Sequence, residues 1–484
     1  MKKSQLLHLA CWVFLTSCSS FQPAPDLGDL YNELAQQEDP YRNPVIVIPG
    51  ILGSRLVDKE SHAVAWGAFG LGQVDPSSPD GARLIALPMV QGRALKSLKD
   101  EVISDGALDR IVVKFFGFPV QLNAYYNILR TLGVGGYRDQ QLAEAKVVDY
   151  GDRHYTCFQY AYDWRRDIVE SAQALDQFIK AKQVEVQKEI ERRFGVKRTN
   201  VKFDLVAHSM GSLVARYYLR YGTADLPEDG RLPELTWEGA RHIDHLVMIG
   251  PPNAGSVETI HMLVQGLRPA FLFPKYPSAV LGTMPSVYQL LSRGRKRALL
   301  DADGQPVKDI FDPAVWKSRQ WGLADPAQAD VLAMLLPDIS DPQKRRQIAL
   351  GHQKKALARA KQLTEALDVA ATPPETVRLV LVAGDAMDTM QSLKVDRNGA
   401  LKVVQWGAGD GTVLRSSALM DERGTRSLGT RLISPIGWSY VLFLFSDHLG
   451  ITEDPAFIDN LLYFLLESPR MGLREGAPSS PGSS

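Results

Sequence analysis

A five-residue segment near the middle of the chain contains a serine in a setting that could make it a nucleophile. The segment is Ala207-His208-Ser209-Met210-Gly211, with small residues two places before and two places after the serine. This spacing is typical of a nucleophile elbow, a sharp turn from a strand into a helix that projects the serine hydroxyl above a sheet. The apolar run Val201–Val206 precedes the turn and a helical pattern, 212–219, follows it. We therefore predict that Ser209 forms an acyl-enzyme intermediate.

A serine hydroxyl is a poor nucleophile without an adjacent base, and His448 is the candidate for that base. Of the nine histidines it is the one closest to the C-terminus, in a loop between an apolar run, 440–445, and a helical pattern, 455–466. On folds with this elbow the chain order is serine, acid, histidine, and His448 fits the last place. We expect the ring of His208 to lie beside the elbow rather than act as the base.

Two places along the chain suit the acid that would orient the histidine ring. Asp410 lies in a glycine-rich segment, 407–413, which can bring a carboxylate close to an imidazole. Asp385 and Asp388 directly follow another apolar run, Val377–Val382, which is also a suitable position for the acid. Loop position alone does not choose between the two places.

The first predicted strand, 45–48, ends in the turn Pro49-Gly50-Ile51-Leu52-Gly53. In folds with a nucleophile elbow, one oxyanion donor comes from such a turn and the other from the residue after the nucleophile. We therefore predict an oxyanion hole formed by the backbone N–H groups of Ile51 and Met210. Each donor of this kind typically lowers the barrier by roughly 3 kcal/mol.

Short apolar runs alternate with helical segments, and they predict the scaffold that positions these residues. Four runs rich in Val, Ile and Leu end in turn formers: 45–48, 201–206, 245–249 and 377–382. Unbroken apolar runs suit strands covered on both faces, as in a parallel sheet. A long helical pattern, 169–193, lies between two of them. We predict an α/β fold, an α/β-hydrolase core with a mostly parallel central sheet and an inserted cap or lid.

The rhythm of strand and helix breaks in several places, and we place domain boundaries there. The expected parts are core segments 44–255 and 375–470, a cap or lid insertion 256–374, a smaller insertion near 58–117, and a disordered tail 471–484. Within the cap, the apolar stretch Leu267–Pro274 is a candidate for a lid or interfacial surface, or equally for a buried part of the cap.

The N-terminus predicts export and membrane anchoring. Lys2 and Lys3 precede an apolar run, Leu6–Leu15, that is too short for an ordinary membrane-spanning helix. The sequence Leu15-Thr16-Ser17-Cys18 resembles the lipobox of bacterial lipoproteins, which makes 1–17 a signal peptide and Cys18 the acylated first residue. Several acyl chains on one residue anchor a protein stably to a membrane surface.

The residues after Cys18 are also consistent with a membrane-anchored lipoprotein. We expect residues 18–43, polar with scattered prolines, to be a tether between membrane and enzyme. In a Gram-negative bacterium, Ser19 after the cysteine indicates the outer membrane.

Composition excludes several classes of protein and site. Lys and Arg number 55, as do Asp and Glu, and no long basic stripe stands out, so we expect no nucleic-acid partner. Of the three cysteines, export removes Cys11 and lipidation uses Cys18, so Cys157 has no disulfide partner. There is no His/Cys cluster with metal-ligand spacing and no glycine-rich phosphate loop, so we expect no metal and no cofactor.

Several stretches, taken in order, resemble the lecithin:cholesterol acyltransferase family, which also contains lysosomal phospholipase and phospholipid:diacylglycerol acyltransferases. The stretches are 44–56, Tyr162-Asp163-Trp164-Arg165, 207–211, 250–256, Gly409-Asp410-Gly411-Thr412-Val413 with its continuation to Ser416, and Asp447-His448-Leu449. The Tyr-Asp-Trp-Arg and Gly-Asp-Gly-Thr-Val pieces are the most specific. The resemblance spans about residues 44–466.

This resemblance implies a function as well as a fold. The family pattern selects Asp410 over Asp385 as the acid, supports Ile51 as an oxyanion donor, and indicates an ester of a membrane lipid as substrate. The acyl group on Ser209 would then pass to water or to an alcohol. The Tyr162–Arg165 segment lies near the active-site face in the family, and packing there is at least as good an explanation for it as a substrate role.

The chain departs from the family in two respects. The animal enzymes use a disulfide to pin a membrane-facing loop, which Cys157 cannot reproduce, and Pro251-Pro252-Asn253-Ala254 stands where they have an aromatic residue. Two other functions stay open: a serine esterase of small soluble esters, and a non-catalytic surface lipoprotein that binds a partner through the same fold.

Overall fold

The computed structural model describes residues 26–68, 74–107, 111–115, 118–122, 125–268, 274–293, 297–307, 309–397, 399–423 and 431–468. The predicted signal peptide, Cys18 and the predicted tail 471–484 lie outside these ranges, as do residues 269–273 of the apolar stretch in the cap. None of the helices in the described ranges has the length and apolar character needed to cross a bilayer.

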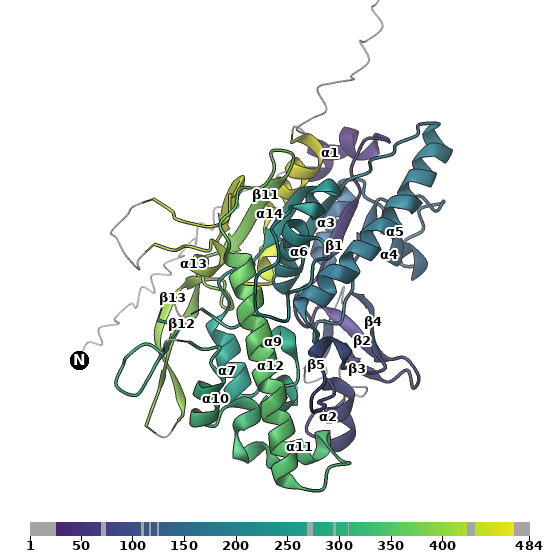
Figure 1. Cartoon of the computed structure of the whole chain (residues 1–484). Helices are drawn as coiled ribbons and strands as arrows, with labels where there is room; N and C mark the ends of the chain where they lie inside the picture. The colour runs from purple at the N-terminus through teal and green to yellow at the C-terminus, as the bar shows by residue number, and fades with distance from the viewer. Residues whose placement is uncertain are drawn as a thin grey trace, which may run out of the picture.

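A six-stranded sheet forms the centre of the molecule, in the order β14-β11-β9-β8-β1-β7, and every neighbouring pair is parallel (Figure 1). Its strands are β1 (Val45–Ile48), β7 (Cys157–Gln159), β8 (Phe203–His208), β9 (Ile243–Ile249), β11 (Arg378–Gly384) and β14 (Tyr440–Leu444). All residues of β1, β8 and β9 are buried, as their mainly apolar sequences predict. Four polar residues of β8 and β9 are buried with them: Asp204, His208, Asp244 and His245. The predicted α/β fold with a parallel sheet is therefore confirmed.

Helices cover both faces of this sheet, and the alternation within β1 shows how. Ile46 and Ile48 pack in one core cluster with residues of α5 (Ile168–Phe194) and α6 (Met210–Tyr221). Val45 and Val47 face the opposite way and pack with residues of α3 (Tyr126–Val134) and α14 (Pro455–Leu462). Successive side chains of a strand point to opposite faces, so a short apolar strand supplies two cores at once.

The range that we expected to be a cap is mainly helical. It contains α7 (Val257–Gln265), α8 (Ser278–Leu281), α9 (Pro285–Gln289), α10 (Pro313–Arg319), α11 (Ala329–Leu335) and the long α12 (Pro342–Asp368), which is prominent in Figure 1. Its short strand β10 (Leu299–Leu300) pairs with the hairpin of β12 (Met387–Val395) and β13 (Leu401–Gly409). That hairpin comes from a range that we had assigned to the core.

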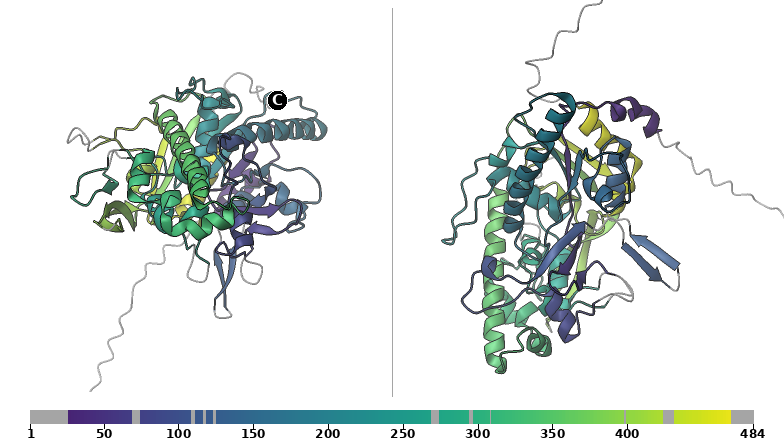
Figure 2. Two further views of the ribbon diagram at one scale, coloured as in Figure 1. Left: turned by 60° about the horizontal axis from the view of Figure 1, so that its bottom comes forward. Right: turned by 90° about the vertical axis from the view of Figure 1, so that its right-hand side faces the viewer.

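A second insertion follows β1. It contains a three-stranded sheet of β2 (Ser54–Asp58), β3 (Val64–Trp66) and β4 (Val102–Ala107), with α2 (Pro79–Ile85). A ribbon of β5 (Ile111–Phe115) and β6 (Phe118–Leu122) continues it and projects from the body of the molecule in Figure 2. The remaining short helices are α4 (Gln140–Glu144) and α13 (Arg415–Ala418).

The expected tether contains a folded helix in its described part. Residues Leu27–Gln36 form α1, whose Tyr31 is buried and donates a hydrogen bond of 2.9 Å to Asp459 Oδ1 in α14. Within the described ranges, part of the expected tether is therefore helical and hydrogen-bonded to α14.

Candidate active site

Ser209 lies in the turn between β8 and α6, with backbone angles that match a strained elbow. Its φ is 51° and its ψ is −125°, in a region that residues with side chains rarely adopt. Its N–H donates a 2.8 Å hydrogen bond to the carbonyl oxygen of Ile249 at the end of β9. The side chain is 7% exposed. The predicted turn is therefore present, and neighbouring strand ends hold it.

Two glycines allow the elbow to approach the turn after β1. A Cβ atom on Gly211 would lie 2.4 Å from the Pro49 carbonyl oxygen and 2.7 Å from that of Ile48. A Cβ atom on Gly50 would lie 2.8 Å from the Cβ of Ser209. The lack of side chains at these two positions is what brings Ser209 next to the predicted oxyanion turn.

We expect Gly211→Ala to destabilise the protein by about 3 kcal/mol or more, because the added methyl meets backbone atoms that cannot move aside. Gly351→Ala is the matched control, since Gly351 is exposed in α12 and a Cβ there meets nothing within 4 Å. That change is expected to stabilise by up to about 1 kcal/mol. Urea unfolding of both variants measures the difference, and equal stabilities would contradict the packing described here.

Asp410 and His448 meet at the same edge of the sheet, although they come from different strand ends. Asp410 Oδ2 accepts a 2.7 Å hydrogen bond from His448 Nδ1, and its backbone oxygen accepts one of 2.9 Å from the His448 amide. The other carboxylate oxygen accepts from the amides of Thr412 and Val413, at 3.0 and 2.7 Å. The carboxylate is thus fixed on both sides, with one oxygen left to orient the imidazole.

Another glycine lets this pair approach the nucleophile. Gly250 follows Ile249, the residue that binds the Ser209 amide, and has a φ of 54°. A Cβ atom on it would lie 3.0 Å from His448 Nδ1 and 3.2 Å from Asp410 Oδ2. Ser209 Oγ makes no hydrogen bond to His448 among the described residues, which is common for a nucleophile and its base before substrate binds.

The charges of the pair stabilise each other. Burial alone would raise the pKa of the Asp410 carboxyl, but His448 and the amides of Val413 and Thr412 outweigh it and hold that pKa below its usual range. Burial disfavours protonated His448, yet the Asp410 carboxylate outweighs burial and raises the pKa of the imidazole. This arrangement stabilises an imidazolium beside a carboxylate, the state that general-base catalysis creates.

The predicted oxyanion donors lie in suitable places. Ile51 is in the turn after β1, and its amide has no hydrogen-bond partner among the described residues. Met210 is the first residue of α6, where helical N–H groups have no partner within the helix and the helix dipole favours negative charge. Leu52, with a φ of 63°, and a 3.1 Å hydrogen bond from Gly53 N to Gly50 O define the turn.

The alternative acids do not contact His448 through any hydrogen bond in the described ranges. Asp385 forms an ion pair of 3.4 Å with Arg415, and Asp388 is exposed on β12, opposite Ala408. A further carboxylate that the sequence did not single out, Glu258 in α7, interacts with both His448 and Asp410. Burial raises the pKa of Glu258, His448 lowers it, and Asp410 raises it.

The Tyr-Asp-Trp-Arg segment supports the turn after β1. Tyr162 donates a 2.8 Å hydrogen bond to the Pro49 carbonyl oxygen, and Trp164 Nε1 donates one of 3.1 Å to Ser54 O. Arg165 is fully buried and pairs with Asp163 at 2.7 Å. A tyrosine outside any motif, Tyr125, accepts a 2.8 Å hydrogen bond from Gly50 N. Sequence reasoning missed Tyr125, because nothing in its surroundings marks it.

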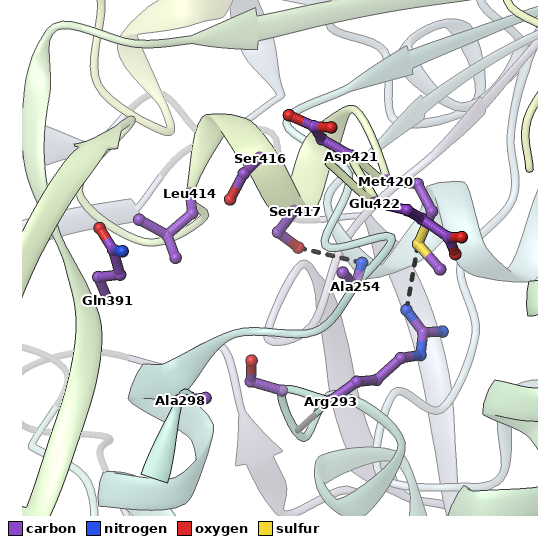
Figure 3. A pocket seen from close by; sticks show the side chains of 11 residues that line it. Ala254, Arg293, Ala298, Gln391, Leu414, Ser416, Ser417, Met420, Asp421 and Glu422 are labelled. Carbon is purple, nitrogen blue, oxygen red and sulfur yellow. Dashed lines mark hydrogen bonds between the residues drawn. The ribbon is translucent and has the colours of Figure 1, made fainter. Parts of the chain in front are cut away.

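A small cavity lies between the loop after β9 and residues 414–422, and its lining does not include Ser209, Asp410 or His448 (Figure 3). Its volume is about 30 Å³, and its lining includes Ala254, Arg293, Gln391, Leu414 and Ser416. Small-molecule sites usually enclose roughly 300 Å³ or more, so this space suits a water rather than an acyl chain. In Figure 3 the Ala254 amide is joined to Ser417, a 3.1 Å hydrogen bond that links the loop after β9 to α13.

One group of residues in the described ranges has the composition of a metal site: Asp204, Asp244 and His245, whose ligand atoms lie within 4.8 Å of one another. They belong to the first half of β8 and β9, whereas Ser209 follows the end of β8. Asp204 Oδ1 already accepts hydrogen bonds from His245 Nδ1 at 2.9 Å and Asn43 Nδ2 at 3.3 Å. These contacts describe a buried, hydrogen-bonded pair of Asp204 and His245.

Comparisons with known proteins agree with this architecture. The family model of lecithin:cholesterol acyltransferase matches residues 140–294. A solved structure of Tle4 in complex with Tli4 covers 87% of this chain and 98% of its own, with 17% identity and a TM-score of 0.51. The structure of the Bacillus licheniformis lipase BlEst2 in its propeptide form covers 90% of this chain and 52% of its own, with 11% identity and a TM-score of 0.33.

Phospholipase PlaB from Legionella pneumophila covers 72% of this chain and 57% of its own, with 13% identity and a TM-score of 0.32. No curated protein sequence matches the chain. The family match over residues 140–294 confirms the predicted resemblance to the acyltransferase family. The parallel sheet and the Tle4 structure, at a TM-score of 0.51, confirm the predicted α/β-hydrolase fold.

Proposed function

We propose that this protein, a relative of lecithin:cholesterol acyltransferase, is a serine-dependent lipid acyl hydrolase or O-acyltransferase. The family match and the fold support ester chemistry on a lipid. The observation that carries the assignment is the 2.7 Å contact of Asp410 with His448, at the sheet edge where Ser209 has its strained backbone. The substrate would be a phospholipid-type ester.

The geometry suits a two-step acyl transfer. Ser209 Oγ attacks the ester carbonyl carbon while His448 Nε2 takes its proton, and the N–H groups of Ile51 and Met210 bind the oxyanion. The ester C–O bond then breaks, and His448 returns the proton to the departing alcohol. Water or a second alcohol next attacks acyl-Ser209, giving its proton to His448, which passes it back to Ser209. Asp410 holds the imidazole tautomer throughout.

Vesicles of phosphatidylcholine and phosphatidylglycerol test the substrate class. We expect the wild type to release fatty acid from vesicles, or to form a new ester when a long-chain alcohol is added, and we expect the Ser209→Ala variant to do neither. Mass analysis of the lipids identifies both products. Rapid Ser209-dependent cleavage of short soluble esters with no action on vesicles would favour the soluble esterase instead. Absence of turnover on either substrate would favour the non-catalytic binding protein.

The location of the enzyme is a separate proposal, carried by the lipobox-like sequence before Cys18. The mature chain would begin at Cys18 and be held by acyl chains at a bacterial outer membrane. The lipid substrate would then lie in, or close to, the membrane that anchors the enzyme. We expect Cys18→Ser to move the protein from the membrane to the soluble fraction, and an unchanged distribution would contradict the anchor.

A further inference from the structure

We infer that Tyr125 and His208 are positioning residues that couple the oxyanion turn to the loop of the catalytic base. This inference rests on the proposed acyl transfer at Ser209 and assigns a task to a buried tyrosine and a buried histidine that the mechanism leaves unused. Both belong to a chain of hydrogen bonds that joins the turn after β1 to the loop after β14.

The chain begins at the peptide bond between Pro49 and Gly50. Tyr162 donates a hydrogen bond to the carbonyl oxygen of this peptide, and Tyr125 accepts one from its N–H, each at 2.8 Å. The two tyrosines are 4% and 3% exposed. Two buried phenols thus hold both polar groups of the peptide. The next backbone amide in the sequence is that of Ile51, the predicted oxyanion donor.

From Tyr125 the chain continues to the base loop. The Tyr125 hydroxyl lies 3.2 Å from His208 Nδ1, and His208 Nε2 lies 3.0 Å from the backbone oxygen of His448. The rings of His208 and His448 are 4.8 Å apart between centroids. His208 is next to Ser209 in sequence, so three parts of the site meet at one imidazole.

The direction of these hydrogen bonds is fixed by the two ends of the chain. The Gly50 N–H can only donate, so the Tyr125 oxygen accepts and its own proton points to His208 Nδ1. The remaining imidazole proton is then on Nε2, where it donates to the His448 carbonyl oxygen, which can only accept. Only one arrangement of protons satisfies every member, and hydrogen bonds aligned in this way strengthen one another.

Burial keeps the chain in this state. Burial, and then the charge of His448, lowers the pKa of His208 to about 3, so the imidazole is neutral at neutral pH. Burial also raises the pKa of the Tyr125 hydroxyl, which keeps its proton. A Cβ atom on Gly53 would lie 2.6 Å from the Tyr125 oxygen, so the turn is folded tightly around this hydroxyl.

The consequence is a shared geometry for the oxyanion hole and the base. Loss of the Tyr125 hydroxyl leaves the Pro49–Gly50 peptide held only through its carbonyl oxygen, by Tyr162. The peptide can then tilt, which turns the Ile51 amide away from the oxyanion. It also removes the partner of His208 Nδ1 and thereby loosens the His448 backbone. Both effects act on the transition state more than on the bound substrate, so they should appear in kcat rather than KM.

Tyr125→Phe tests this directly, with Tyr221→Phe as the matched control. The Tyr221 hydroxyl is likewise buried and donates to a backbone oxygen, that of Ala366 at 2.6 Å, which lies in α12. With an ester that the wild type cleaves, we expect Tyr125→Phe to lower kcat by about tenfold or more, with KM within about twofold, while the control keeps the kcat of the wild type. Tyr162→Phe should also lower kcat.

A second readout does not depend on turnover. In protein labelled with ¹⁵N-histidine, we expect His208 to show a proton on Nε2 and none on Nδ1 at neutral pH, and Tyr125→Phe to shift its Nδ1 resonance. The inference is overturned if His208 is protonated on Nδ1, or if Tyr125→Phe and Tyr221→Phe lower kcat equally. A wild type with the expected His208 tautomer but no turnover would contradict the proposed function and leave the hydrogen-bond chain intact.

Discussion

Replacement of His448 by alanine is expected to lower kcat for ester cleavage by about 10⁵-fold to 10⁶-fold, because Ser209 then has no base to take its proton. His448 is held by Asp410 through its ring and its backbone amide, and Gly250 leaves room for the ring beside the elbow. Initial rates on the preferred ester at several substrate concentrations measure the change.

The control for this variant is another histidine, away from the sheet edge. His154 precedes β7 and lies near Glu189 in α5, and His154→Ala should keep kcat within about twofold. A His448→Ala enzyme that retains a tenth of the activity would show that another group accepts the proton. His208 would then be the next candidate, although its burial and neutral state argue against that role.

Asp410→Asn should lower kcat by about 10⁴-fold, because an amide cannot stabilise the imidazolium and favours the wrong tautomer of His448. The Asn oxygen can still accept from the amides of Thr412 and Val413, so the loop is expected to keep its shape. Asp385→Asn is the matched control, since Asp385 pairs with Arg415 instead. Equal losses in the two variants would contradict the assignment of Asp410 as the acid.

The pH dependence gives the same variant a second readout. The base works only when His448 is neutral, and Asp410 raises the pKa of His448 above its ordinary value. Activity of the wild type should therefore fall, as pH decreases, at a higher pH than an unperturbed histidine would give. Removing the carboxylate charge removes this effect, so the acid limb of kcat/KM in Asp410→Asn is expected to move to lower pH.

Sequence patterns were sufficient for the parts of this fold that depend on local order. The runs rich in Val, Ile and Leu became β1, β8, β9 and β11, because strands buried on both faces of a parallel sheet need mainly apolar sequence. The elbow around Ser209 was predicted for a similar reason, since small residues at fixed spacing are required where backbones meet. Gly50 and Gly211 show this requirement. Gly50, in the turn after β1, approaches Ser209, and Gly211, in the elbow, approaches the carbonyl oxygens of Ile48 and Pro49.

Other features depend on contacts between distant residues, and the sequence did not reveal them. The prediction of Asp410 over Asp385 as the acid needed the family resemblance. Asp410 lies in a glycine-rich segment and Asp385 follows an apolar run, and loop position alone suits both. The partners of Tyr125 lie 75 and 83 residues away, and no local pattern indicates them. Helix α1 was assigned to the tether because most of its surface is polar and only Tyr31 is buried.

The most direct test of the central claim is the mass of the protein after reaction with a fluorophosphonate, followed by peptide mapping. We expect one phosphonyl group per chain, attached to Ser209, with no adduct in Ser209→Ala and slow labelling in His448→Ala. A folded wild type that stays unlabelled, or an adduct on another residue that persists in Ser209→Ala, would contradict the claim that Ser209 is the nucleophile.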